Sequence, residues 1–315
     1  MRTMIVATIT SHPPISLYCG RFAPSPTGPL HFGSLLAAVG SYLDARSCGG
    51  VWRVRMEDVD RPRCNDEAAD AILRMLEVYG FEWDGEVMYQ SRRDAAYRAA
   101  FDRLCVTGRV FPCACTRREL ADSQTSLLAG DGALVYPGTC RNGLPPGRAP
   151  RTWRLRVDDA QISFDDRIQG HIEQNLASEA GDFVLLRADE LFAYQLAVVV
   201  DDAEQGITHV VRGADLLDST PRQILLQQLL GMPTPLYAHL PVIVDMHGEK
   251  LSKQTLAAPL MIEQAQSALL VALALLGQAP LPQLCDASLG DLWQWAQQHW
   301  DLAKVPHCRA LPAAE

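Results

Sequence analysis

Apolar and polar positions near the N-terminus alternate first with the period of a strand and then with that of a helix. The segment LYCGRF (17–22) is a predicted strand, and residues 34–47 fit a helix that a Gly-Gly pair ends. In VWRVRM (51–56), apolar residues alternate with arginines, which is the period of a second strand. Strand, helix and strand at this spacing form a βαβ unit and predict a parallel sheet.

The pattern changes in the middle of the chain. Helices are predicted near 66–79 and 92–107. Residues 108–180 are rich in Gly, Pro, Arg and Cys and hold two short strand-like pieces, TWRLRV and QISFDD, which indicates an inserted subdomain. The α/β pattern then returns with three apolar segments that we interpret as strands, DFVLL (182–186), LAVVV (196–200) and ITHVV (207–211).

The last third of the chain is mainly helical. A helix is predicted to start at Thr220-Pro221, where threonine is a good N-cap and proline a good first residue. After HLPVIVD (239–245) and the polar loop MHGEKLSKQ, amphipathic helices are expected at about 260–276 and 289–302. The second helix has one apolar stripe that we expect in the core, made of Leu289, Leu292, Trp293, Ala296 and Trp300.

The composition is that of a globular protein. Of 315 residues, 48% are hydrophobic and 21% charged, and no apolar run reaches the ~20 residues that a membrane span requires. The N-terminus lacks the long apolar region of a signal peptide. Nine cysteines, an odd number, argue against a disulfide framework. We therefore expect a cytoplasmic protein. We also expect a monomer.

The net charge of −9 argues against a generally basic nucleic-acid-binding surface, but one local basic patch is present. It contains no acidic residue and consists of Arg141, Arg148, Arg151, Arg154 and Arg156. Two interpretations stay open for it: a solvated loop followed by an edge strand, and a surface that faces RNA.

The segment PSPTGPLHFGS (24–34) lies between the first predicted strand and the first predicted helix. A loop rich in Gly and Pro at this position presents backbone N–H groups and a helix N-terminus to an anion. Gly28 and Gly33 flank His31, which is a polarising donor. The dinucleotide fingerprint G-x-G-x-x-G is absent, which argues against a dehydrogenase. Taken alone, the loop is either a phosphate site or a plain tight turn.

A second segment, KLSKQ (250–254), lies in a loop far downstream and alone fits a solvated turn. Together with HFGS (31–34) it resembles the two signatures of the class I aminoacyl-tRNA synthetases, which are of the His-x-Gly-His and Lys-Met-Ser-Lys-Ser types. Both versions here depart at the last position, and the second has Leu in place of Met. The first His, the Gly and both lysines are kept.

Five blocks resemble the glutamyl branch of this class and occur in the family's order across residues 20–255. They are GRFAPSPTGPLHFGS, RMEDVDRPR (55–63), DFVLLRAD (182–189), AYQLAVVVDDAEQGITHVVRGADLLDSTPRQ (193–223) and KLSKQ. The resemblance implies an α/β fold with a Rossmann-like, parallel-sheet catalytic domain. The expected parts are an N-terminal extension (1–15), the catalytic domain (16–107 and 181–256), an inserted zinc-binding, acceptor-type subdomain (108–180) and a short C-terminal helical region (257–315), with no anticodon-binding domain.

The resemblance implies that ATP, bound with Mg2+, activates L-glutamate to glutamyl-adenylate and pyrophosphate. Negative charge builds on the phosphate oxygens, so catalysis depends on positioning and electrostatic stabilisation. The implied catalytic residues are His31 and Gly33 on one side and Lys250 and Lys253 on the other. The implied ATP-binding residues are Pro24, His31, Gly33, Ser34 and Lys253.

The family's glutamate-binding positions correspond here to Arg21, Phe22, Ala23, Pro24, Ser25, Glu57, Tyr194 and Arg212. The chemistry agrees, because Arg21 and Arg212 can pair with carboxylates. Glu57 and Arg212 also end predicted strands, where open α/β sheets bind ligands. The alternatives are a structural salt bridge for Glu57 or Arg212 and a core or interface position for Tyr194.

Only 61 residues follow Gln254, too few for the large anticodon-binding region of a full glutamyl-tRNA synthetase. The short form resembles a subfamily that activates glutamate without tRNA and transfers it to the queuosine base at the wobble position of tRNA(Asp). RGADLLDST (212–220) also fits that subfamily. Three alternatives stay open: a short glutamyl-tRNA synthetase that charges the 3′ end of tRNA(Glu), a non-catalytic RNA-binding relative, and a ligase with a small amine acceptor.

Three cysteines cluster in the inserted subdomain, within CAC (113–115) and YPGTC (136–140). Three thiols leave a zinc site one ligand short, and Cys105 or His171 can complete it. In the resembled subfamily a tyrosine takes this place, which implies structural Zn2+ bound by Cys113, Cys115, Tyr136 and Cys140. Free thiols are the alternative.

Overall fold

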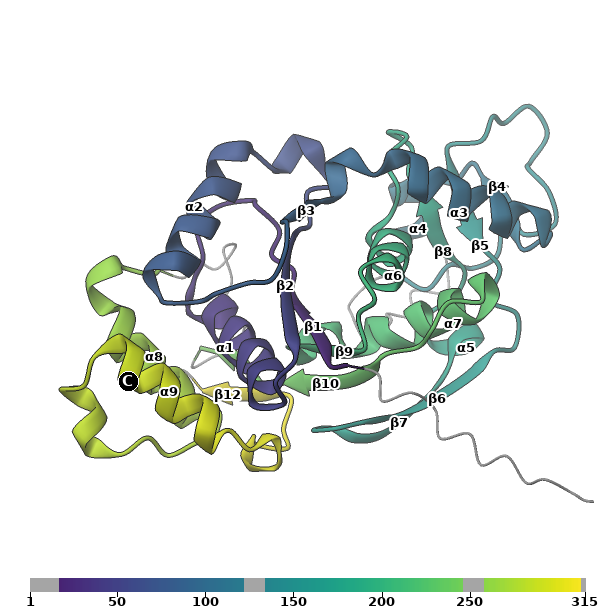
Figure 1. The fold of residues 1–315 in the computed structure, drawn as a ribbon. Helices are drawn as coiled ribbons and strands as arrows, with labels where there is room; N and C mark the ends of the chain where they lie inside the picture. The colour runs from purple at the N-terminus through teal and green to yellow at the C-terminus, as the bar shows by residue number, and fades with distance from the viewer. Residues whose placement is uncertain (1–16, 122–133, 246–257, 313–315) are drawn as a thin grey trace, which may run out of the picture.

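The computed structural model describes residues 17–121, 134–245 and 258–312. A parallel sheet lies at its centre (Figure 1). β1 pairs in parallel with β2, β2 with β3, and β9 with β10. The two groups meet where the Thr208 N–H donates to the Cys19 carbonyl oxygen at 2.9 Å, so β9 lies beside β1. The strands are β1 (Cys19–Phe22), β2 (Val51–Met56), β3 (Met88–Tyr89), β9 (His209–Gly213) and β10 (Leu236–Leu240). The predicted parallel sheet is confirmed.

Helices cover both faces of this sheet and enclose two separate apolar cores. The first core is formed with α1 (Phe32–Ser47), α2 (Asp66–Val78), α8 (Ala265–Leu275) and α9 (Leu289–His299). The second is formed with α3 (Asp94–Val106), α6 (Tyr194–Glu204) and α7 (Thr220–Leu230). Successive strand residues serve opposite faces, as a pleated strand requires: Val210 lies in the second core and Val211 in the first.

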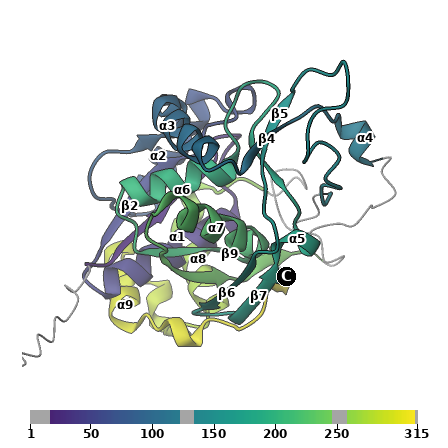
Figure 2. The ribbon, with the colours of Figure 1, turned by 90° about the vertical axis from the view of Figure 1, so that its right-hand side faces the viewer.

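The inserted region adds an antiparallel sheet and a hairpin, which Figure 2 shows at the edge of the molecule. The sheet has the order β4-β5-β8, and the hairpin joins β6 to β7. The elements are β4 (Val110–Cys113), α4 (Arg117–Ala121), β5 (Thr152–Leu155), β6 (Gln161–Asp166), β7 (Gly170–Asn175), α5 (Leu176–Glu179) and β8 (Phe183–Leu186). The hairpin reaches β10, where Asp166 accepts a hydrogen bond from the His239 backbone N–H at 3.1 Å.

The C-terminal segment packs on the first core. The Trp293 indole N–H donates to the Tyr79 carbonyl oxygen at 2.8 Å, and Leu292 and Ala296 are buried beside it, which confirms the predicted apolar stripe of α9. A short parallel pair, β11 (Val242–Val244) and β12 (Ala310–Pro312), joins the end of the described chain to the body of the molecule. No helix within the described ranges is long and apolar enough to cross a bilayer.

Most predicted elements are confirmed with ends shifted by a few residues, but one assignment is wrong. LAVVV (196–200) lies inside α6 and is not a strand. All five of these side chains are buried, at 5% exposure or less, because α3 and α7 pack against α6. A helix enclosed in this way needs no polar face, so a short apolar run does not distinguish it from a buried strand.

Candidate active site

The glycine- and proline-rich loop leads from β1 into α1, and His31 is the N-cap residue of that helix. The His31 Nε2 atom lies 3.2 Å from the Ser34 hydroxyl. No acidic residue stands in the first turn of α1, which the structure describes completely, so no carboxylate there neutralises the positive end of the helix dipole. A positive helix end without an acidic neighbour is an environment that favours an anion such as a phosphate group.

The second signature, with Lys250 and Lys253, lies outside the described residues. The described chain resumes at residue 258 and contacts the first loop. Pro259 forms an antiparallel bridge with His31, and the Leu260 N–H donates to the Leu30 carbonyl oxygen at 2.9 Å. The described chain at residues 259 and 260 therefore lies beside the first signature.

Four buried charged side chains meet where β1 and β2 end. Asp202 of α6 accepts from Arg21 Nε at 3.2 Å and pairs with Arg55 Nη1 at 2.8 Å. Arg55 Nη2 lies 3.3 Å from Glu57 Oε1. Burial raises the pKa of Glu57, while the charges of Arg55 and Arg21 oppose that rise. The salt bridge considered as an alternative for Glu57 is present, with Arg55 as its partner.

Sequence reasoning missed Arg55 and Asp202. Alternation along β2 favours an exposed position for Arg55, yet this side chain is fully buried. Asp202 follows the apolar run of α6, in the pair Asp201-Asp202. A charge at the end of so apolar a segment was the available signal, because a buried carboxylate requires a cationic or hydrogen-bonding partner.

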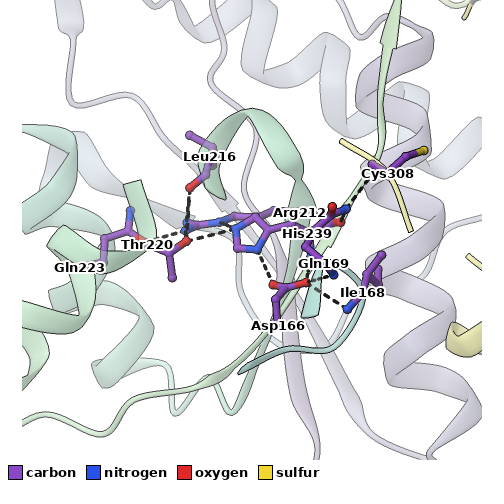
Figure 3. A network of polar contacts seen from close by, with 9 residues as sticks. All are labelled: Asp166, Ile168, Gln169, Arg212, Leu216, Thr220, Gln223, His239 and Cys308. Carbon is purple, nitrogen blue, oxygen red and sulfur yellow. Dashed lines mark hydrogen bonds and ion pairs between the residues drawn. The ribbon is translucent and has the colours of Figure 1, made fainter. Parts of the chain in front are cut away.

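Arg212 and Tyr194, the remaining predicted glutamate-binding residues with polar side chains, lie near this charged cluster. Arg212 lies near the end of β9 and donates to His239, Thr220 and Gln223 (Figure 3). Tyr194 is the first residue of α6. Burial raises the pKa of Tyr194 to about 12, the charge of Glu57 adds to the rise, and Arg212 and Arg21 oppose it. The Tyr194 hydroxyl therefore lies within the electrostatic reach of these three charges.

Residues 22–25, at the end of β1 and the start of the loop, differ in what their side chains and backbone contact. Phe22 is 7% exposed and stacks on Trp52 in the first core, so its side chain faces away from solvent. The Pro24 carbonyl oxygen accepts from the Glu57 N–H at 2.9 Å and ties the loop to the end of β2. Ala23 is half-buried and Ser25 exposed.

A cleft of about 1080 Å³ opens beside Tyr194 and extends to the inserted sheet. It is rich in arginine, and the arginines that line it are Arg117, Arg118, Arg151, Arg154, Arg187 and Arg222. Two of the five arginines predicted as a basic patch are therefore in the cleft. Arg141 and Arg148 instead pair with acidic residues of the subdomain, Asp182 and Glu119.

The three clustered cysteines meet at the end of β4. The Sγ atoms of Cys113, Cys115 and Cys140 lie within 4.8 Å of one another. The Tyr136 hydroxyl lies 3.4 Å from Cys113 Sγ and 3.9 Å from Cys115 Sγ. His171, one alternative fourth ligand, instead pairs with Asp165 on the exposed face of the hairpin. The geometry thus brings together three thiols and one phenol that can surround a metal ion.

Known proteins with similar sequences point to one family. The family model described as tRNA synthetases class I (E and Q), catalytic domain, matches residues 19–278. The glutamyl-Q tRNA(Asp) synthetase of Aromatoleum aromaticum is 63% identical over 92% of this chain and 90% of that protein. The protein of the same name from Dechloromonas aromatica is 61% identical over 92% of this chain and 96% of its own length.

A solved structure shows the same fold. The glutamate-tRNA synthetase from Elizabethkingia anophelis aligns with a TM-score of 0.78 and 26% identity, over 95% of this chain and 68% of that one. The motifs, the sheet and the relatives lead to one assignment. The chain belongs to the glutamyl-Q tRNA(Asp) synthetase family, within the class I tRNA synthetases for glutamate and glutamine.

Proposed function

We propose that this protein is a ligase that activates L-glutamate with ATP, independently of tRNA, and transfers it to queuosine at the wobble position of tRNA(Asp). The observation that carries this proposal is that the neighbouring strands β2, β1 and β9 bring Glu57, Arg21 and Arg212 to Tyr194, beside the loop that leads into α1. Relatives that are named for this tRNA support the choice of acceptor. We place the enzyme in the cytoplasm and expect a monomer.

In the activation step a glutamate carboxylate oxygen attacks the α-phosphorus of ATP. A new oxygen–phosphorus bond forms, the bond to the β-phosphate bridging oxygen breaks, and pyrophosphate leaves. His31 and the N-terminus of α1 stabilise the phosphate oxygens from one side, and Lys250 and Lys253 from the other. Pro24, Gly33 and Ser34 shape the loop around ATP, which enters with its Mg2+. No nucleophilic side chain is required.

Glutamate fits the charged cluster because it carries two carboxylates and one ammonium group. Arg212 provides a cation for one carboxylate, Arg21 provides one for the other while it also pairs with Asp202, and Glu57 provides an anion for the ammonium group. Tyr194 adds a hydroxyl that remains protonated at neutral pH. Because the site is largely buried, these interactions are less weakened by water than on an exposed surface.

In the transfer step a hydroxyl of the queuosine cyclopentenediol attacks the carbonyl carbon of the adenylate. The new ester bond forms, AMP leaves, and we assign the hydroxyl proton to the adenylate phosphate. A single active-site substitution that abolishes transfer while activation continues contradicts that assignment. The arginine-lined cleft beside Tyr194 gives the RNA backbone a route to the adenylate, because phosphates bind guanidinium groups.

The cysteine cluster is proposed as a structural Zn2+ site with Cys113, Cys115, Tyr136 and Cys140 as ligands. Zn2+ in structural sites takes four ligands, and thiolates are its preferred ones. The phenol supports the fourth position because it already lies against two of the three thiols. The ion would fix the end of β4 to the 136–140 turn and takes no part in the chemistry.

Exchange of pyrophosphate into ATP tests the activation step. We expect exchange that depends on glutamate and proceeds without tRNA. Labelled glutamate then locates the acceptor, and we expect the label on the queuosine base of tRNA(Asp).

Each remaining alternative has its own outcome. Label on the 3′-terminal adenosine of tRNA(Glu) identifies a short glutamyl-tRNA synthetase. Absence of exchange identifies a non-catalytic RNA-binding relative. Exchange with no transfer to queuosine-containing tRNA identifies a ligase for a small amine.

A further inference from the structure

Arg212 is held by a buried chain of polar groups that the proposed reaction does not yet explain. Arg212 and His239 are register partners on the parallel strands β9 and β10. Asp166 ends β6, directly beyond His239 (Figure 3). Arg212 is 5% exposed, His239 is fully buried and Asp166 is 4% exposed. Three titratable side chains in a row inside a protein are costly unless each has a defined partner.

Donor and acceptor chemistry fixes the proton on His239. Arg212 Nε can only donate and lies 3.0 Å from His239 Nε2, so Nε2 must accept. The imidazole proton is then on Nδ1, which donates to Asp166 Oδ2 at 2.6 Å. His239 is therefore neutral. Burial lowers its pKa to about 4, Asp166 opposes that shift and Arg212 adds to it.

Asp166 is itself held in place. Its Oδ1 atom accepts from the backbone N–H groups of Ile168, Gln169 and His239 at 3.0, 2.9 and 3.1 Å. The carboxylate therefore keeps one oxygen for the backbone and presents the other to His239. This arrangement leaves one tautomer of the imidazole.

The guanidinium group of Arg212 is oriented by neutral partners. Nε donates to His239, and Nη2 donates to the Thr220 hydroxyl and the Gln223 side-chain carbonyl, both at 2.8 Å. Nη1 is buried and has no hydrogen-bond partner in the described part of the chain. Arg21 and Arg55, in contrast, share the carboxylate of Asp202. Arg212 is thus aligned with its positive charge available for a ligand carboxylate.

We propose that Asp166 and His239 are positioning residues for the substrate carboxylate: they hold Arg212 in its binding orientation through a fixed histidine tautomer. The inference rests on the proposed function, in which Arg212 binds glutamate. A histidine between the two charges has a physical advantage over direct contact. A carboxylate placed on Nε would compete with the carboxylate of the ligand, whereas a neutral imidazole aligns Arg212 without competing.

The Asp166→Asn variant tests the tautomer. Asn keeps the shape and an oxygen for the backbone N–H groups, but its amide N–H2 then faces His239 Nδ1. Nδ1 must accept, the proton moves to Nε2, and two donors face each other at Arg212 Nε. We expect the KM for glutamate in the exchange assay to rise at least about tenfold, with the KM for ATP nearly unchanged. Nitrogen NMR of the histidine is expected to show the change from Nδ1–H to Nε2–H.

A pair of substitutions at His239 separates alignment from packing. The amide oxygen of His239→Gln can accept near the position of Nε2, so we expect most of the glutamate affinity to remain. His239→Asn reaches only the position of Nδ1 and is expected to match Asp166→Asn. Asp165→Asn is the matched control, because Asp165 forms a similar pair with His171 at 2.8 Å on the exposed face of the same hairpin.

Two results overturn the inference. One is a wild-type KM for glutamate in folded Asp166→Asn and His239→Asn. The other is an equal rise of both KM values, which shows a purely structural effect. Wild-type exchange is measured first and with glutamate alone, so a failure of the proposed function appears there and is not confused with a failure in the variants.

Discussion

Lysine is rare in this protein, and its positions are informative. Of 28 Lys and Arg residues only three are lysines, Lys250, Lys253 and Lys304, and every ion pair with a carboxylate described above uses arginine or histidine. Arginine binds planar carboxylates in a fixed fork, whereas the lysine ammonium is a compact charge that can follow a phosphate group as it changes shape. Lysine at positions 250 and 253 of an arginine-rich chain therefore supports their proposed role at ATP.

Removal of one ammonium group tests that role. In Lys253→Ala we expect glutamate-dependent pyrophosphate exchange to fall about a hundredfold or more, because a charge that stabilises the transition state is lost. Lys304→Ala, at an exposed position, is the matched control and should retain the exchange rate. Exchange by Lys253→Ala at the wild-type rate, with circular dichroism unchanged, contradicts the assignment.

Acid should weaken the fold through His239. Its pKa is about 4 in the folded protein against an ordinary 6.5, so between these values the unfolded chain binds a proton that the folded chain does not. The free energy of unfolding therefore decreases as pH falls through this window. Burial raises the pKa of Asp166 and its contact with His239 lowers it further than that, so Asp166 adds to the loss of stability only at more acidic pH; Arg212 and Asp215 are the other charges that act on the imidazole.

Urea unfolding measures this effect. Between about pH 7 and about pH 5 the wild-type protein is expected to lose more stability than His239→Gln, which cannot take up the proton; one such group contributes at most about 1.4 kcal/mol per pH unit. Equal losses in the two proteins would show that other groups cause the acid sensitivity.

The helices and strands could be predicted wherever the local pattern carried the information. The alternation in β2 and the glycines after α1 are local signals, and both elements are found as expected. α6 could not be identified in this way, because its apolar character comes from burial between other helices and not from its own period. β8 lies in the part of the chain expected in the catalytic domain, yet it pairs with β5 of the inserted sheet, a contact that no local pattern encodes.

The end of α8 depends on a glycine that no other residue replaces well. Gly277 has φ +75°, and a Cβ atom there would lie 2.1 Å from the Lys304 carbonyl oxygen. We expect Gly277→Ala to destabilise the protein by roughly 3 kcal/mol or more, from backbone strain and a backbone collision. Gly49, which follows α1 with φ +63°, has open space around it, so Gly49→Ala should cost only about 1 kcal/mol. Equal losses measured in urea would contradict the collision.

The zinc site proposed in the inserted subdomain can be tested by replacing its ligands. Replacement of Cys113, Cys115 and Cys140 by serine should remove the bound zinc, and Tyr136→Phe should weaken its binding, because each change deletes a ligand atom. Zinc content by atomic emission is the measurement. Cys105→Ser, on α3, is the control and should keep the metal. Unchanged zinc in the triple variant eliminates the site.

The contacts that orient the site residues form only in the folded chain, between residues that are far apart in the sequence. The family motifs located Arg21, Glu57, Tyr194 and Arg212, since each lies in a recognisable block. The residues that orient them come from elsewhere: Asp202 lies 181 positions from Arg21, and His239 lies 73 positions from Asp166. No local pattern encodes such contacts, because they arise only when the sheet and the hairpin come together.

We expect the arginines that line the cleft to bind the tRNA and to have no role in the activation step. For Arg117→Gln combined with Arg151→Gln we expect transfer to tRNA to fall about tenfold at moderate salt, with a shallower salt dependence, while pyrophosphate exchange without tRNA stays unchanged. Arg109→Gln, which removes an ion pair with Asp158 and does not line the cleft, is the control. Loss of exchange in the double variant would contradict the separation of the two steps.

The short pair β11–β12 has a practical consequence for anyone who produces this enzyme. β12 ends at Pro312, and its neighbour β11 leads through Asp245 into the segment that carries the two signature lysines. A shortened clone that stops before Ala310 would remove β12 and leave β11 without its partner strand. Clones made for assays of glutamate activation should therefore keep residues 310–312, so that β11 retains the strand with which it pairs.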